Sequence, residues 1–183
     1  MAYIRRILFE PDPMLRKVAK KVSNFELKLP LTRQLIDDMF ATMHDAPGIG
    51  LAAPQVGVSK RIIVVHLGED EPHYAVINPV LSEFEGEQEG VEGCLSIPGK
   101  IGDVKRALAC TVTGLDRYGK KFSLRAEGLL ARCFQHEVDH LDGVLYPMRM
   151  TDMASLGFSD VIQAEAKAAG EEVELDEEGV PLE

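Results

Sequence analysis

The sequence predicts an α+β fold, in which antiparallel β-sheets pack around a central helix and another helix lies near the N-terminus. Apolar residues recur with helical spacing near the N-terminus and again over residues 128–142. Between these segments, several short runs rich in β-branched residues follow one another without intervening helices. Strands grouped in this way favour antiparallel sheets over the alternating order of a parallel α/β protein.

The helices are predicted from end signals and spacing. Asp12 followed by Pro13 is typical of a helix start and predicts a short helical segment. Over residues 31–43 the apolar side chains lie mostly three or four positions apart, which predicts a helix. This helix should end before Pro47 and Gly48, because both residue types interrupt helices.

The strands are predicted from short apolar runs bounded by turn residues. The expected strands are residues 61–67, 74–78, a stretch around 80–87, 109–115 and 121–126. The sequence DRYGKK between the last two predicts an antiparallel hairpin. Residues 48–57, GIGLAAPQVG, are small and glycine-rich, which predicts a tight turn or a close-packed loop. They lack the lysine and hydroxyl of a phosphate-binding loop.

Length and composition predict one domain over residues 1–170, followed by an acidic tail over residues 171–183. The tail holds seven acidic residues and no basic one, so it contributes seven of the ten net negative charges. A segment of this composition is expected to be solvated and partly disordered. No basic cluster suggests a nucleic-acid site.

The sequence predicts a cytoplasmic monomer that is not inserted in a membrane. The N-terminal residues lack the apolar region of a signal peptide, and no apolar run reaches the 18 residues of a membrane span. Three cysteines, an odd number, do not indicate a disulfide framework. A reducing compartment is therefore expected, and nothing in the sequence suggests an interface between subunits.

Residues 128–142 are predicted to form the central helix, with polar residues on two sides. One side is a stripe that should face water, formed by Arg132, Gln135, Asp139 and Asp142. Glu137 points to the opposite, apolar side, beside Phe134. A buried, unpaired carboxylate costs several kcal/mol or changes its protonation state, so a neighbouring group must compensate for it.

The same helix carries the pattern HExxH. His136 and His140 lie one turn apart, about 6 Å, which is close enough for both imidazoles to bind one metal ion. Glu137 lies between them, where it can take a proton from water at the metal. Two ligands do not make a stable catalytic site, so a third is required.

From the residues alone, several groups could supply the third ligand. Tyr146 stands where metzincin proteases carry their last histidine, and Asp160 or Glu165 would be the downstream acid of a gluzincin protease. Cys133 shares the helix but is expected to be a buried core thiol. Cys94, in EGCLSIPG, would offer a thiolate, which binds iron or zinc well.

Three segments in this order, GIGLAAPQ, EGCLS and QHEVDHL, resemble the three motifs of peptide deformylases, and the resemblance spans roughly residues 5 to 155. It implies a peptide-deformylase-like fold in which Cys94, His136 and His140 bind the metal. It also implies that Glu137 is the catalytic acid and base. The side-chain amide of Gln55 and the backbone N–H of Leu95 would stabilise the oxyanion.

The resemblance implies a metal-dependent hydrolase that removes the formyl group from the N-terminal formylmethionine of new polypeptides and releases formate. Water activated by the metal would attack the formyl carbon, and Fe²⁺ is the expected metal, although Zn²⁺, Ni²⁺ or Co²⁺ would suit these ligands. Proximity to the ribosome is expected without a direct nucleic-acid site. The implied substrate-binding residues are Ile49, Gly50, Gly93, Leu129 and Cys133.

Two other functions share parts of this pattern. A zinc endopeptidase of the HExxH type would need a third ligand downstream and a cleft for both sides of the scissile bond. A structural zinc module would close the site with four protein ligands, namely Cys94, Cys133, His136 and His140. Arg106 is expected to have either a structural role or a contact with substrate.

Overall fold

The structure, a computed structural model, describes residues 2–158 and has the predicted α+β composition with antiparallel sheets. The acidic tail predicted for residues 171–183 lies outside the described residues, as do Asp160 and Glu165. Among the residues that the structure describes, no helix has the length and apolar character needed to cross a membrane.

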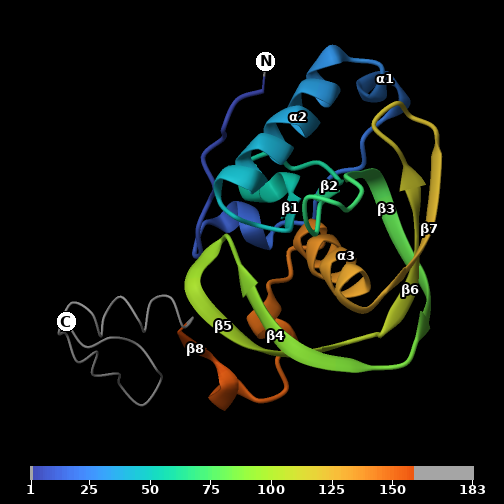
Figure 1. Ribbon diagram of the computed structural model, residues 1–183. Coiled ribbons are helices and arrows are strands. Elements are labelled where there is room, and N and C mark those ends of the chain that lie inside the picture. Colours follow the sequence, from blue (N-terminus) through green and yellow to red (C-terminus); the bar gives the residue numbers. More distant parts are fainter. Residues whose placement is uncertain (1, 159–183) are drawn as a thin grey trace.

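Two antiparallel sheets form the framework (Figure 1). The larger sheet has the order β1-β2-β3-β6-β7, with β1 Gly50–Ala52, β2 Ile62–Val65, β3 Tyr74–Glu85, β6 Ala109–Leu115 and β7 Lys121–Glu127. The smaller sheet has the order β4-β5-β8, with β4 Gln88–Cys94, β5 Ile97–Arg106 and β8 Gly157–Phe158. β6 and β7 pair as the antiparallel hairpin predicted from DRYGKK.

Three α-helices and four 3₁₀ turns complete the described chain. The α-helices are α1 Asn24–Leu27, α2 Pro30–Asp45 and α3 Gly128–Leu141, and the 3₁₀ turns are Pro13–Arg16, Ala53–Val56, Tyr146–Arg149 and Met153–Ser155. Asp12 caps the first turn by accepting a hydrogen bond from the backbone N–H of Met14. α2 begins with a proline, and its last residue precedes the expected stop at Pro47.

The core lies on both faces of β2, which explains why this strand is an uninterrupted apolar run. Ile62 and Val64 belong to the apolar cluster with α2, whereas Ile63 and Val65 belong to the cluster with α3. Burying each such side chain contributes about 1.5–3 kcal/mol. Figure 1 shows α3 in the middle of the molecule, between the larger sheet and the β4–β5 ribbon.

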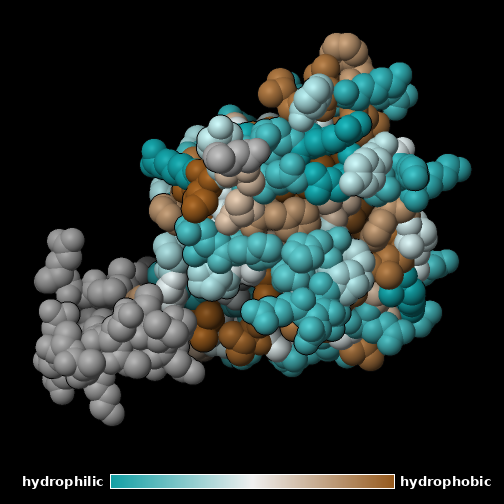
Figure 2. All heavy atoms as spheres, turned by 45° about the horizontal axis from the view of Figure 1, so that its top comes forward, coloured by the Kyte–Doolittle hydropathy of each residue, from teal (hydrophilic) through white to brown (hydrophobic). Residues whose placement is uncertain are grey.

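The outer surface follows the usual pattern of a globular protein. Figure 2 shows one face as mainly hydrophilic, with hydrophobic side chains in separate patches. The most exposed large apolar side chains include Leu31 on α2 and Phe25 on α1. Isolated groups of this kind are normal and need no partner to explain them.

The strand prediction was incomplete around the smaller sheet. The sequence gives no strong period-2 signal in residues 88–106, yet this segment forms β4 and β5, which pair along most of their length. The predicted strands 74–78 and 80–87 form one strand, β3, with a register shift between Ile77 and Val80. The predicted loop 48–57 contains β1 and a 3₁₀ turn.

The prediction that the polar stripe on α3 faces water was wrong for three of its four residues. Arg132, Gln135 and Asp139 are each less than 9% exposed, whereas Asp142 remains near the surface and pairs with Arg61 at 2.6 Å. The buried three face the β4–β5 ribbon, where other polar groups meet them. Helical spacing shows which residues share a face, but it does not show whether a polar face meets water or polar protein groups.

The N-terminal segment is held against α2 by the buried carboxylate of Asp38. Its Oδ1 accepts hydrogen bonds from the backbone N–H of Tyr3 at 2.9 Å and from Gln34 at 2.7 Å. Its Oδ2 accepts two more from the guanidinium of Arg5, at 2.9 and 2.8 Å. Burial raises the pKa of Asp38, but these hydrogen bonds outweigh it and hold the pKa below its usual value.

We expect Asp38→Asn to lower the free energy of unfolding by about 2 kcal/mol at pH 7, because it removes charge-assisted hydrogen bonds. The folded pKa is depressed, so this stabilisation is complete above the unfolded pKa of about 3.9 and is lost as pH falls through the folded pKa. Urea unfolding of both proteins at pH 7, 5 and 3 measures the difference, which should shrink only at the lowest pH.

Asp37→Asn is the matched control for this prediction. Asp37 adjoins Asp38 on α2 but pairs with Arg117 at the surface, where the side chains are 44% and 30% exposed. Its replacement should cost less than about 1 kcal/mol, because exposed ion pairs contribute little. Equal losses for the two variants would contradict the role given to Asp38.

Candidate active site

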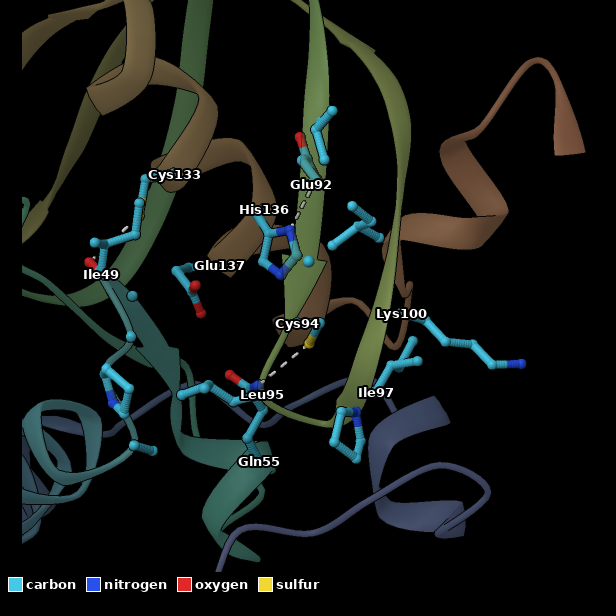
Figure 3. A pocket seen from close by; sticks show the side chains of 18 of the residues that line it. Ile49, Gln55, Glu92, Cys94, Leu95, Ile97, Lys100, Cys133, His136 and Glu137 are labelled. Atoms are coloured by element: carbon cyan, nitrogen blue, oxygen red, sulfur yellow. Dashed lines mark hydrogen bonds and ion pairs between the residues drawn. The ribbon is translucent and has the colours of Figure 1, made fainter. Parts of the chain in front are cut away.

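A cavity of about 600 Å³ lies where α3, β1 and the β4–β5 turn meet (Figure 3). The structure brings to it every site residue predicted from the sequence except His140, which lies directly behind the lining and beside Cys94. The predicted residues in the lining are Ile49, Gly50, Gln55, Gly93, Cys94, Leu95, Leu129, Cys133, His136 and Glu137. These residues are up to 88 positions apart in the chain, so the tertiary fold assembles the site.

Cys94, His136 and His140 form a cluster whose ligand atoms all lie within 4.8 Å of one another. The two histidines lie one turn apart on α3, and Cys94 ends β4, with its Sγ 3.2 Å from Nε2 of His140. A tetrahedral ion about 2.0–2.3 Å from each atom needs separations of roughly 3.3–3.7 Å, so the donor set fits a metal. One thiolate and two imidazoles suit iron, zinc, nickel or cobalt.

Glu137 lies beside this cluster and points into the cavity (Figure 3). It is 4% exposed, and its Oε2 is buried without a hydrogen-bond partner among residues 2–158. Burial raises the pKa of Glu137 to about 7; His136 and Arg106 act against this shift, and the Glu92 carboxylate adds to it. A carboxyl group of this kind can accept and return a proton near neutral pH.

Gln55 is held in one orientation at the floor of the cavity. Its Oε1 accepts a hydrogen bond from the backbone N–H of Ala52 at 2.8 Å. Its Nε2 donates to Oγ of Ser96 at 3.1 Å and lies 3.6 Å from Sγ of Cys94. The amide N–H groups therefore face the metal-ligand cluster, beside the turn that carries Leu95.

The apolar part of the cavity wall contains Ile49, Leu129 and Cys133. Ile49 is 40% and Leu129 54% exposed, so both side chains offer apolar surface to a molecule in the cavity. Cys133 is 5% exposed and donates to the backbone oxygen of Ile49 at 3.5 Å. Burial raises the pKa of the Cys133 thiol, and the nearby charges of Glu137 and Glu92 raise it further, so the thiol stays protonated.

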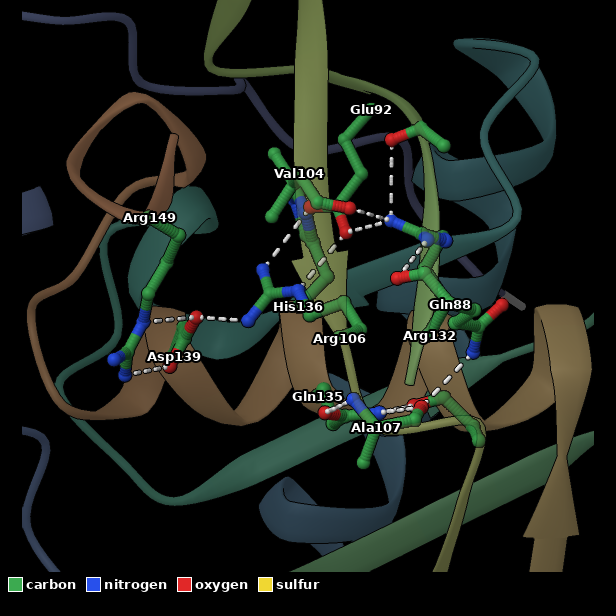
Figure 4. Close-up of polar contacts among 12 residues, drawn as sticks. Gln88, Glu92, Val104, Arg106, Ala107, Arg132, Gln135, His136, Asp139 and Arg149 are labelled. Atoms are coloured by element: carbon green, nitrogen blue, oxygen red, sulfur yellow. Dashed lines mark hydrogen bonds and ion pairs between the residues drawn. The ribbon is translucent and has the colours of Figure 1, made fainter. Parts of the chain in front are cut away.

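Glu92 holds the outer nitrogen of His136 and was missed in the sequence. Its Oε2 lies 2.8 Å from Nδ1 of His136, which leaves Nε2 of that ring for the metal-ligand cluster (Figure 4). Arg106 and Arg132 both donate to Glu92, at 2.9–3.0 Å. Burial raises the pKa of Glu92, but the bonds with His136 and Arg106 outweigh it and lower the pKa to about 2.

A second carboxylate extends this network (Figure 4). Asp139 accepts from Arg106 at 2.5 Å and from Arg149 at 2.7 and 3.1 Å. Arg106 is 7% exposed and bridges Glu92 and Asp139, so its role is structural. The clue in the sequence was the acid two residues before Cys94, because residues i and i+2 of a strand face the same side.

Taken together, the α+β fold and the cavity are those of a metal-dependent hydrolase. A family model described as polypeptide deformylase matches residues 4–155, and the chain therefore belongs to the polypeptide deformylase family. Members of this family remove the N-terminal formyl group from nascent peptides, and this chain is an enzyme of that kind.

Individual relatives agree with this family. A peptide deformylase of Symbiobacterium thermophilum is 48% identical over 177 residues, which cover 96% of this chain and 80% of that protein. A peptide deformylase structure from Legionella pneumophila has a TM-score of 0.76 and 44% identity, covering 90% of this chain and 92% of that one. The Met-Ala-Ser-bound class I type b enzyme of Acinetobacter baumannii has a TM-score of 0.77 and 37% identity, covering 82% and 100%.

Glu92→Gln should weaken metal binding by about 10- to 100-fold, because a neutral amide supports the His136 ring less well and removes the carboxylate that pairs with Arg132. Metal retention during dialysis against a graded chelator, followed by metal analysis, measures the loss. Circular dichroism confirms that the variant is folded. Glu89→Gln, on the exposed side of the same strand, should keep wild-type retention. If both variants lost metal equally, the support of His136 by Glu92 would be excluded.

Gly50→Ala should reduce formate release by about 100-fold, because misplacing a catalytic group by about 1 Å has an effect of this size. A Cβ at position 50 would lie 2.8 Å from Sγ of Cys133 and would contact the carboxylate of Glu137. Gly68→Ala is the control, since a Cβ there meets nothing within 4 Å. Turnover of a formylated peptide measures both, and full activity of Gly50→Ala would contradict this close packing.

Proposed function

We propose that this deformylase uses Glu137 as its general base and acid, with Cys94, His136 and His140 as the ligands of one metal ion on an HExxH helix, α3. The observation that carries the proposal is the position of Glu137. It is a buried carboxylate, one oxygen of which has no hydrogen-bond partner in the described part of the chain, next to a Cys-His-His cluster at the wall of an open cavity. General acid–base catalysis requires a proton carrier in this position.

The proposed metal is ferrous iron, although zinc, nickel or cobalt would also suit one thiolate and two imidazoles. When bound, the ion supplies Lewis acidity, which makes water more acidic and polarises a carbonyl group. The protein supplies the ligands and holds His136 through Glu92. Because a thiolate ligand is the oxidisable form of cysteine, an iron-loaded enzyme is expected to lose activity in air.

The proposed reaction follows from the remaining side chains. Glu137 accepts a proton from the attacking water, and the oxygen adds to the formyl carbon. The oxyanion that forms accepts hydrogen bonds from the Gln55 amide and the Leu95 N–H. Glu137 then returns the proton to the leaving amine, so that formate and a free N-terminal methionine are released.

The proposed substrate is a formylmethionyl peptide. The relative from Acinetobacter baumannii has Met-Ala-Ser bound, which has the sequence of a deformylated product. Here Ile49, Leu129 and Cys133 would surround the methionine side chain. The backbone at Ile49, Gly50 and Gly93 would bind the peptide as an added strand, since strand edges offer main-chain hydrogen bonds.

The two rival functions fit the structure less well. A structural zinc module needs Cys133 as its fourth ligand, but the Cys133 thiol bonds to Ile49 and lies outside the ligand cluster. A zinc endopeptidase needs a downstream third ligand, whereas Cys94 already completes the cluster with His136 and His140. Cys94→Ser should therefore weaken metal binding strongly, whereas an endopeptidase would bind its metal unchanged.

The cellular setting is also a proposal. Three free cysteines and a substrate made by the ribosome support a cytoplasmic enzyme that acts close to the ribosome. We propose that it acts as a monomer, with residues 1–170 as one catalytic domain and the acidic residues 171–183 outside the chemistry. The tail is expected to be repelled by ribosomal phosphates, so it would not anchor the enzyme there.

The first test is formate release from N-formyl-Met-Ala-Ser by nickel-loaded protein. Glu137→Gln should lose at least about 100-fold in kcat while keeping one metal per chain, because it cannot carry the proton. Gln55→Ala should lose about 100- to 1,000-fold, the usual effect of removing one oxyanion donor. Metal content, measured on the same samples, separates loss of chemistry from loss of the ion.

Lys100→Ala serves as the control, because its side chain lies at the cavity wall without belonging to the proposed machinery. It should release formate at nearly the wild-type kcat. Unchanged turnover by Glu137→Gln would eliminate Glu137 as base. No formate from wild-type protein that holds one metal per chain would argue against the proposed chemistry as a whole.

A further inference from the structure

The five histidines of the chain all lie in two clusters. His136 and His140 belong to the active site, and the deformylation chemistry uses none of the other three. His44, His66 and His73 form the second cluster, in which one ligand atom from each residue lies within 4.8 Å of the others. The ligand atoms of the active-site cluster also lie within 4.8 Å of one another.

Three separate elements bring these imidazoles together. His44 lies in the last turn of α2, His66 follows β2, and His73 immediately precedes β3. Nε2 of His44 is 2.9 Å from Nδ1 of His66, and the rings of His66 and His73 stack with centroids 3.7 Å apart. Phe40 packs edge-on against His73 at 5.3 Å, so it supports the cluster from one side.

The ligand chemistry of this cluster is specific. Neutral imidazole is the most common protein ligand of zinc, copper and nickel, whereas magnesium and calcium need oxygen ligands. Three imidazoles with nitrogens about 3.3 Å apart would suit a tetrahedral ion at 2.0–2.1 Å. Because the His66 and His73 rings are stacked, one of them must turn for both to present a nitrogen to the same ion. His44 and His73 are exposed at the surface, so an ion can reach the cluster from solvent.

We propose that His44, His66 and His73 form a second metal site, which binds Zn²⁺ or a similar borderline divalent ion through three imidazoles and completes its coordination with water. The alternative is a cluster held only by ring stacking and one hydrogen bond. That alternative leaves Nε2 of His66 buried without a partner among residues 2–158. Because the imidazole ring can turn, either nitrogen of His66 can face the ion and the other can turn away.

A metal at this position would connect α2 to the β2–β3 connection next to the active-site cavity. The backbone N–H of His66 donates to the backbone oxygen of Ile49 at 2.9 Å, and Ile49 lines the cavity. His44 lies just before the segment from Ala46 to Gly50, which lines the same cavity. The ion would therefore stabilise the wall on which the substrate is proposed to lie, without touching the reacting atoms.

Zinc and cobalt binding to metal-depleted, full-length protein test this proposal. Equilibrium dialysis against Zn²⁺ should give two equivalents per chain for wild type and one for His73→Ala or His66→Ala. Cys94→Ala should lose the active-site equivalent and keep the second. With Co²⁺, the Cys94 site gives a thiolate-to-cobalt charge-transfer band, whereas the three-histidine site gives only the weaker bands of an all-nitrogen site.

Glu71→Ala, in the same connection as His73, is the matched control and should keep both equivalents. Added Zn²⁺ should raise the Tm of Cys94→Ala but not that of Cys94→Ala/His73→Ala, because only a bound ion shifts unfolding. Formate release by nickel-loaded His73→Ala should stay near the wild-type value, which shows that this variant is folded.

Two results would overturn the proposal. One is uptake of only a single equivalent of zinc by the wild-type protein at about 100 µM free Zn²⁺. A site whose Kd exceeds this concentration would be too weak to count as specific. The other is a second equivalent that His73→Ala and His66→Ala retain with unchanged affinity, which would place it elsewhere on the surface. Both results leave the deformylase chemistry untouched, since that is measured separately with Glu137→Gln.

Discussion

The active site depends on one buried carboxylate, that of Glu92. It contacts Arg106 from β5 and both Arg132 and His136 from α3, while Glu92 itself lies on β4. The smaller sheet and the helix are therefore joined by charged groups with little access to water. Replacing a buried pair by apolar residues is often neutral, but removing one partner typically costs about 3–5 kcal/mol. Glu92 contacts His136 directly, and Arg106 and Arg132 hold Glu92 in position.

The location of this network explains how the three parts of the cavity come together. β1 and the 3₁₀ turn that follows it provide the backbone around Gly50 and Gln55, the smaller sheet provides Cys94, and α3 provides the histidines and Glu137. α3 packs on the larger sheet through apolar side chains such as Phe134, and it meets the smaller sheet through polar ones. One helix can serve both purposes because its apolar and polar faces are each matched by a different sheet.

The contrast between apolar and polar contacts also determines which elements could be predicted from the sequence. Helices α2 and α3, the β6–β7 hairpin and the buried position of Glu137 follow from local periodicity, which the sequence shows directly. β4 and β5 escaped prediction because their interior face mixes the charged residues Glu92 and Arg106 with the apolar Val104, while Val91 is 60% exposed. For the same reason, the polar stripe that contains Arg132 and Asp139 was predicted to face solvent although it is buried against charged groups. Local patterns do not reveal a polar interior, since its partners lie far away in the chain.

The two histidine clusters also differ in whether the sequence reveals them. His136 and His140 are visible as a metal motif because a helix places residues i and i+4 together wherever the helix packs. His44, His66 and His73 are spread over 30 positions, and only the pairing of β2 with β3 beside the end of α2 makes them neighbours. Such a cluster has no sequence signature, so it becomes apparent only in the folded chain. Its position behind Ile49 means that any ion bound there would act on the cavity through the backbone of β1.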